Sequence, residues 1–145
     1  MSERRKLVPL IPRHFTRVSL VYGEEVLRRR FKGIFRWVSV TTSSLDHPEK
    51  ISEELKSLSR RTGIFLGTQK DIDRINQVLK ALGHVPVDRA QALKDGGLYV
   101  IYPRPNGGYL MVLLGRDLKE LQEAMVRLYL AEDLPSSGSI ITSGR

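Results

Sequence analysis

The sequence predicts a single α/β domain: a mixed sheet of about five strands with helices packed on its faces, ending in a C-terminal β-hairpin and a helix. The length of 145 residues suits one domain with its own core. In the first half, β-branched runs alternate with helical apolar patterns, which is typical of right-handed crossovers and a parallel core. Later, Asn106-Gly107 separates two apolar runs and favours a hairpin.

Strands and helices alternate in the first half of the predicted domain. β-branched and aromatic residues dominate three runs that we expect to be strands, residues 15–22, 34–42 and 64–66. Apolar residues at helical spacing predict helices over 24–32, 47–61 and 69–82. Asp46, with Glu49 three residues on, is the expected N-cap of the second helix, and Thr68 with Asp71 that of the third.

The second half holds the predicted hairpin and the last helix. We expect one or two helical turns at 88–94, strands at 98–102 and 109–114, and a helix from Asp117 to about Leu128. The domain then spans residues 14–133. A basic, Pro-containing arm (1–13) precedes it, and a flexible Gly/Ser-rich tail (134–145) follows.

Composition excludes several classes of site. The chain has no cysteine, so disulfides and thiolate chemistry are excluded. His14, His47 and His84 are far apart, and no metal-binding or catalytic motif surrounds them. We therefore predict no catalytic residues, no metal and no cofactor. No apolar run is long enough to span a membrane, and the first residues do not resemble a signal peptide, so we expect a cytoplasmic protein.

The positive charge is concentrated near the N-terminus. Residues 1–40 carry +7 of the net charge of +8. Such an excess attracts polyanions, although a heat-adapted surface or a merely solvated helix face has the same composition. The candidate nucleic-acid contacts in this segment are Arg4, Arg5, Lys6, Arg13, Arg28, Arg29, Arg30, Lys32 and Arg36.

The hairpin tip adds a further candidate contact. A two-residue turn at Asn106-Gly107 would set Arg104 opposite Tyr109 in a projecting tip, where they could grip phosphate and stack a base. In that geometry Arg104→Ala leaves folding nearly intact. Alternatively, Pro103 and Pro105 only protect a sheet edge, because prolines cannot donate to another strand.

Two strand-to-helix loops are candidates for an anion or nucleotide site. In a parallel sheet both would emerge at the carboxyl edge, where ligands bind and helix N-termini offer free N–H groups. Their residues are Thr41, Thr42, Ser43 and Ser44 in one loop and Gly67, Thr68 and Lys70 in the other. Serine and threonine are also ordinary helix caps, so capping alone is the competing interpretation.

The leading functional hypothesis is a non-catalytic nucleic-acid-binding or ribonucleoprotein-associated domain, with RNA slightly favoured over DNA. A second hypothesis is a nucleotide or phosphometabolite sensor or enzyme that uses the two loops. A third is a docking subunit of a larger assembly, because a basic surface also suits an acidic protein partner. The sequence resembles no family closely enough to name one.

Overall fold

The protein is seen in a computed structural model that describes residues 7–8, 18–34, 39–58, 60–92, 98–104, 108–130, 134–135 and 138–141. The strands and helices in these ranges follow in chain order: β1 (Leu7–Val8), β2 (Val18–Tyr22), α1 (Glu25–Ile34), β3 (Ser39–Ser43), α2 (Pro48–Ser57), β4 (Thr62–Thr68), the 3₁₀ turn η1 (Gln69–Asp71), α3 (Ile72–Ala81), α4 (Arg89–Ala92), β5 (Leu98–Pro103), β6 (Tyr109–Gly115), α5 (Leu118–Leu130), β7 (Leu134–Pro135) and β8 (Gly138–Ile141).

The main sheet has the strand order β3-β2-β4-β6-β5-β8. Its parallel part consists of three pairings, β2 with β3, β2 with β4, and β4 with β6. β5 lies antiparallel to β6 on one side and to β8 on the other. β1 and β7 form a separate two-stranded antiparallel sheet, which brings two segments near opposite ends of the chain together.

The α/β class is confirmed, but the expected mixed sheet of about five strands, ending in a C-terminal β-hairpin and a helix, is wrong. Beyond the hairpin strands the described chain continues through α5 to β8, and β8 joins the sheet. β8 lies inside the segment expected to be a flexible tail. Its pairing with β5 runs from Leu98 to Ile101 and stops before Pro103, which has no N–H to donate. Backbone pairing thus recruits a segment whose Gly/Ser-rich composition suggested a tail.

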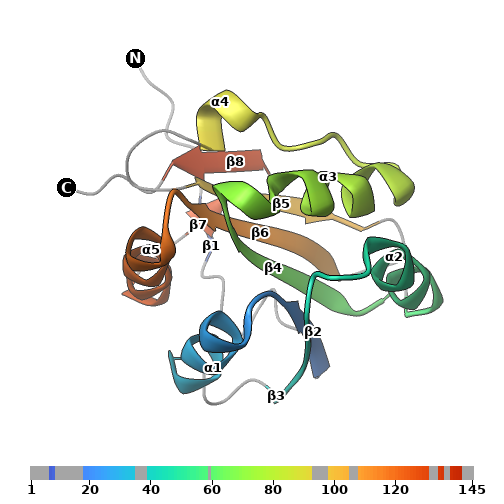
Figure 1. Ribbon diagram of the computed structural model, residues 1–145, viewed down its shortest axis with the longest axis horizontal. Helices are drawn as coiled ribbons and strands as arrows, with labels where there is room; N and C mark the ends of the chain where they lie inside the picture. The colour runs from blue at the N-terminus through green and yellow to red at the C-terminus, as the bar shows by residue number, and fades with distance from the viewer. Residues whose placement is uncertain are drawn as a thin grey trace.

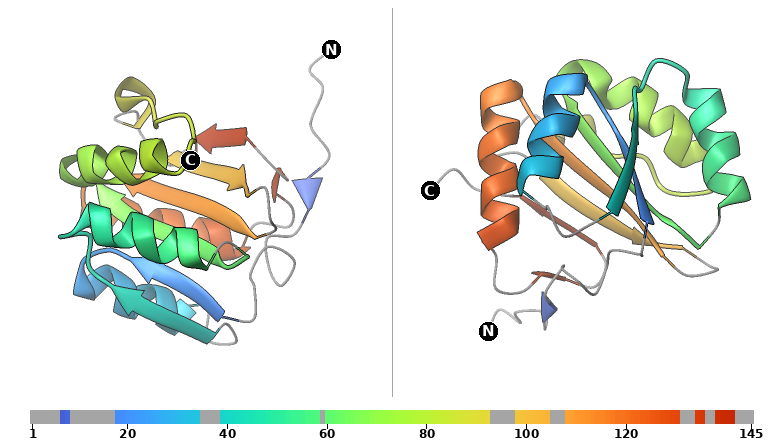
Figure 2. Two further views of the ribbon diagram at one scale, coloured as in Figure 1. Left: turned by 90° about the vertical axis from the view of Figure 1, so that its right-hand side faces the viewer. Right: turned by 90° about the horizontal axis from the view of Figure 1, so that it is seen from below.

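Helices cover the sheet on both faces (Figures 1 and 2). α1 and α5 lie side by side on one face, where Leu27, Phe31 and Leu121 are fully buried. α2 and α3 cover the other face, with Leu55 and Ile75 in the core. The result is a three-layer arrangement with a hydrophobic core on each side of the sheet.

The apolar strands explain why both faces need covering. Along β6, Leu110, Val112 and Leu114 belong to the core under α2 and α3. The alternating residues Met111 and Leu113 belong to the core under α1 and α5. Because successive side chains of a strand point to opposite faces, an unbroken apolar run is stable only between two layers.

The strand order creates a topological switch point, meaning a place where neighbouring connections leave the sheet toward opposite faces. The chain leaves β2 into α1 on one face and leaves β4 through η1 into α3 on the other. β2 and β4 are parallel neighbours, so these connections separate at the carboxyl edge between them. Open α/β sheets bind ligands in the crevice that such a separation leaves.

Among the glycines that the structure describes, two have positive φ, and their surroundings differ. Gly108 has φ +76°, and a Cβ there would lie 2.7 Å from the Arg60 carbonyl oxygen. Gly83 has φ +83°, and a Cβ there would meet nothing within 4 Å. Only glycine adopts this conformation without strain, and at Gly108 it also permits close backbone packing.

We expect Gly108→Ala to destabilise the protein by about 3 kcal/mol, because backbone strain and overlap with a carbonyl add together. Gly83→Ala tests the conformational cost alone and should lower the free energy of unfolding by only about 1 kcal/mol. Urea denaturation of both variants measures the difference. Equal losses would show that Gly108 is not tightly packed.

Candidate functional site

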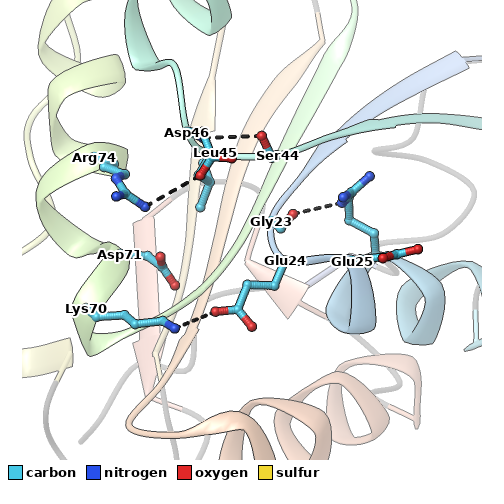
Figure 3. Close-up of a pocket in the computed structure, with 10 residues that line it drawn as sticks. Gly23, Glu24, Glu25, Ser44, Leu45, Asp46, Lys70, Asp71 and Arg74 are labelled. Carbon is cyan, nitrogen blue, oxygen red and sulfur yellow. Dashed lines mark hydrogen bonds and ion pairs between the residues drawn. The ribbon is translucent and has the colours of Figure 1, made fainter.

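A crevice of about 500 Å³ lies at the carboxyl edge, where the loops after β2, β3 and β4 converge (Figure 3). Its lining is dominated by charged side chains rather than by the apolar groups that fill the core. The described lining consists of Gly23, Glu24, Glu25, Arg28, Ser44, Leu45, Asp46, Lys70, Asp71 and Arg74.

Two ion pairs join the loops around the crevice. Lys70 Nζ lies 2.6 Å from Glu24 Oε1, which links the β4 side to the start of α1. Arg74 Nη1 lies 3.9 Å from Asp46 Oδ1, which links α3 to the loop after β3. The hydrogen bond and the charge of Glu24 raise the pKa of Lys70, so this amine stays protonated at neutral pH. Both pairs are partly exposed, and water screens them.

Gly23 shapes the floor of the crevice beside α1. Its N–H donates to the Ser43 carbonyl at 3.0 Å, and its carbonyl accepts from Arg28 Nε at 2.8 Å. A Cβ at Gly23 would lie 2.7 Å from the Leu66 carbonyl oxygen. The absence of a side chain therefore lets the loop after β2 lie directly against β4.

Asp71 is the buried carboxylate of the crevice, with only 3% of its surface exposed. Its Oδ2 accepts hydrogen bonds from Thr68 N at 2.9 Å and from Thr68 Oγ1 at 3.4 Å. These contacts belong to the capping box expected from the sequence. Gly67 leaves room for this arrangement, because a Cβ there would come within 2.9 Å of Asp71 Cβ.

The fold brings the two predicted anion-site loops together. Ser44 and Lys70 both line the crevice, while Gly67 and Thr68 lie beside it and position Asp71. The backbone carbonyl of Ser43 accepts a hydrogen bond from the Gly23 N–H, and Ser43 itself is exposed. The two threonines of the first loop, Thr41 and Thr42, lie within β3 and not in the loop itself.

Sequence reasoning missed the acidic part of the site. Asp46 was expected to cap α2, but His47 is the N-cap and makes no side-chain capping bond, so Asp46 is free to face Arg74. Glu24, the first residue of the helix predicted over 24–32, was not among the candidate site residues. Glu24 follows β2 and Asp46 follows β3, so both lie at the same sheet edge as Lys70. That position is the signal that could have located them.

The basic segment is divided. Arg28 turns toward the crevice, whereas Arg29 pairs with Glu25 at 2.6 Å on the surface of α1. Arg30 and Lys32 are exposed on the same helix. The remaining candidates lie outside the described residues: Arg4, Arg5, Lys6, Arg13 and Arg36.

The hairpin register differs from the expected one by one residue. Pro103 pairs with Tyr109, and Arg104 N donates to the Gly108 carbonyl at 3.1 Å, so Arg104 does not face Tyr109. A one-residue shift reverses which face each side chain takes. Tyr109 packs against the core under α1 and α5, while Arg104 reaches α2 on the other face. The two residues of the predicted turn, Asn106 and Gly107, lie outside the described residues.

Arg104 does not project from the protein, so that expectation is wrong. Its Nη1 donates to the carbonyls of Arg61 at 2.7 Å and Leu58 at 3.1 Å, and its Nη2 donates to the carbonyl of Leu55. These carbonyls lie at the end of α2 and in the turn into β4, where helix geometry leaves acceptors unsatisfied. Burial lowers the pKa of Arg104, yet a guanidinium stays charged at neutral pH.

Within the part of the chain that the structure describes, no three His, Asp or Glu side chains are grouped to hold a metal ion. Across the same residues, each helix is too short or too polar to cross a bilayer.

Comparisons with known proteins add little. No family model matches the chain, and no curated protein matches it. A solved structure titled "Structure of CpGH84D" is similar to this chain, with a TM-score of 0.47 and 10% sequence identity. The match covers 96% of this chain and 23% of that one, so this chain spans a small part of that protein. A likeness this weak is no guide to function.

We expect Arg104→Ala to destabilise the fold by about 2–3 kcal/mol, because it removes charge-assisted hydrogen bonds to the backbone carbonyls of Leu55, Leu58 and Arg61. Arg30→Ala, which removes an exposed arginine from α1, should change the free energy of unfolding by less than about 0.5 kcal/mol. Thermal and urea unfolding of the two variants provide the comparison. An Arg104→Ala protein as stable as the Arg30→Ala control would contradict this structural role.

Proposed function

We propose that the crevice binds a small metabolite carrying an anionic group, such as a phosphate or a carboxylate. The observation that carries this proposal is the convergence of three strand-to-helix loops at the switch point of the sheet. Ligands of open α/β sheets bind at this position. A cavity of about 500 Å³ is in the size range of small-molecule sites.

Three cationic side chains support the anionic class of ligand. Lys70 and Arg74 lie on the β4 side of the crevice. Arg28 belongs to α1, on the other side. The crevice also includes the beginning of α1, where backbone N–H groups lack partners within the helix and the helix dipole favours negative charge. An anion held between these groups would touch both walls.

Binding to a defined panel tests the proposal: inorganic phosphate, ATP and the common amino acids, each followed by amide chemical shifts. We expect at least one probe to shift the amides of Gly23, Glu24 and Asp71. Lys70→Gln should weaken that probe by about tenfold, because it removes a charged hydrogen-bond donor.

Lys56→Gln is the matched control, because it removes the same charge from the last turn of α2, at the opposite edge of the sheet. It should leave binding unchanged. Failure of every probe to shift crevice amides would overturn the proposal, as would equal effects of the two lysine substitutions.

A second candidate function is polyanion binding through α1. Arg29, Arg30 and Lys32 are all exposed on this helix, which lies in the outer layer of the molecule (Figure 1). Exposed cations on one helix suit the phosphates of a nucleic acid, with RNA preferred to DNA as the sequence suggests. An acidic protein partner would contact the same side chains.

The salt dependence of oligonucleotide binding tests this candidate. We expect single-stranded RNA to bind at low salt and the double variant Arg30→Gln, Lys32→Gln to reduce the log–log salt slope by about 2, since each lost phosphate contact changes it by about 1. Lys56→Gln should leave the slope unchanged. RNA binding that is absent at low salt, or independent of salt, would remove this candidate.

A further inference from the structure

The crevice is not a simple anion site, because carboxylates alternate with its cations. Glu24 faces Lys70, Asp46 faces Arg74, and Figure 3 shows Asp71 between Lys70 and Arg74 on the same wall. The described lining thus presents both signs of charge within the same small volume.

A ligand with only negative charge fits this arrangement poorly. An anion that binds Lys70 comes close to Glu24, because the Glu24 carboxylate is already paired with the same ammonium group. Asp71 adds a second negative charge that cannot turn away, because its side chain is 3% exposed and held by Thr68. Like charges at close range repel each other, and a buried carboxylate such as Asp71 is screened less than an exposed one.

A ligand with both charges avoids this cost by exchanging partners. Its anionic group takes the place of Glu24 beside Lys70, and its ammonium group takes the place of Lys70 beside Glu24. The side chains of Lys70 and Glu24 are 68% and 36% exposed, so both can move apart without disturbing the core. No charge is left unpaired after the exchange.

Asp71 provides a fixed acceptor for the same ammonium group. Its Oδ2 is engaged by Thr68, and among the described residues no donor is bonded to its Oδ1. An ammonium group has three N–H donors, so it can be shared between Glu24 and Asp71. Because the capping box fixes the Asp71 carboxylate, it can orient the ligand, which the flexible side chains of Lys70 and Glu24 alone cannot do.

We propose that the ligand of the crevice is a small amphoteric metabolite that carries an ammonium group close to a carboxylate or phosphate, the class to which free amino acids belong. This inference rests on the proposed binding of an anion-bearing metabolite and specifies its chemistry. Glu24 and Asp71 recognise the ammonium group, and Lys70 with Arg74 recognises the anionic group.

The sign of the Glu24→Gln effect distinguishes the two ligand classes. If the ligand is amphoteric, losing the carboxylate weakens binding by about tenfold. For a purely anionic probe such as inorganic phosphate, the same change removes the competitor for Lys70 and strengthens binding. Glu53→Gln, on the exposed face of α2 and outside the crevice lining, is the matched control and should alter neither.

The probes are paired so that they differ in the ammonium group. Each amino acid that binds is compared with its N-acetyl derivative, and phosphoethanolamine is compared with inorganic phosphate, by titration calorimetry. We expect each amine-bearing probe that binds to do so at least about tenfold more tightly than its partner. The two pairs distinguish a carboxylate ligand from a phosphate ligand.

Asp71→Asn tests the ammonium contact in a second way. It removes the charge but keeps the capping bond, because the amide oxygen still accepts a hydrogen bond from the Thr68 N–H. It should weaken amphoteric probes and leave thermal stability close to that of the parent protein.

Equal binding of amine-bearing and blocked probes, or tighter binding of an amino acid after Glu24→Gln, would overturn this inference. If phosphate or ATP still binds through Lys70 in that case, the proposed function stands. If no probe depends on Lys70, the proposed function itself fails.

Discussion

The parallel pairing of β2 with strands on both sides, β3 and β4, is the constraint on which the rest of the structure depends. A right-handed connection to β3 puts α1 on one face of the sheet, and the return to β4 puts α2 on the other. Both faces must then be apolar, as β4 and β6 are. The same topology separates the chain at the carboxyl ends of β2 and β4, so the crevice is a consequence of the strand order.

The two edges of the sheet are held by different physical means. At the amino edge of β4, the Arg104 guanidinium is fixed by backbone carbonyls at the end of α2, and Gly108 packs against Arg60. At the carboxyl edge, the loops are joined by exposed ion pairs such as Lys70 with Glu24. Charge-assisted bonds to fixed carbonyls resist rearrangement, whereas screened pairs of flexible side chains exchange partners easily.

Asp71 has a fixed place in the fold and also lines the crevice. Asp71 completes the capping box with Thr68, which fixes where η1 and α3 begin. The same hydrogen bonds hold the Asp71 carboxylate at the wall of the crevice. Because Gly67 and Gly23 have no side chains, the neighbouring chain segments can lie close enough to form the walls. Local helix geometry thus fixes this wall of the crevice, which would lower the ordering cost of binding the proposed ligand.

Local signals in the sequence predicted the α/β class, most helices and strands, the Thr68–Asp71 capping box and the two loops that meet at the crevice, because these depend on residues a few positions apart. Asp46 was misassigned because a capping box and an ion pair use the same side chain, and only the approach of α3 decides between them. The role of Arg104 and the hairpin register depended on α2, more than forty residues away in sequence. β8 joined the sheet because β5 had a free edge, which composition does not reveal. Spacing along the chain determines which elements form, whereas the partners of each charge and each strand edge are decided by distances that exist only after the layers have packed.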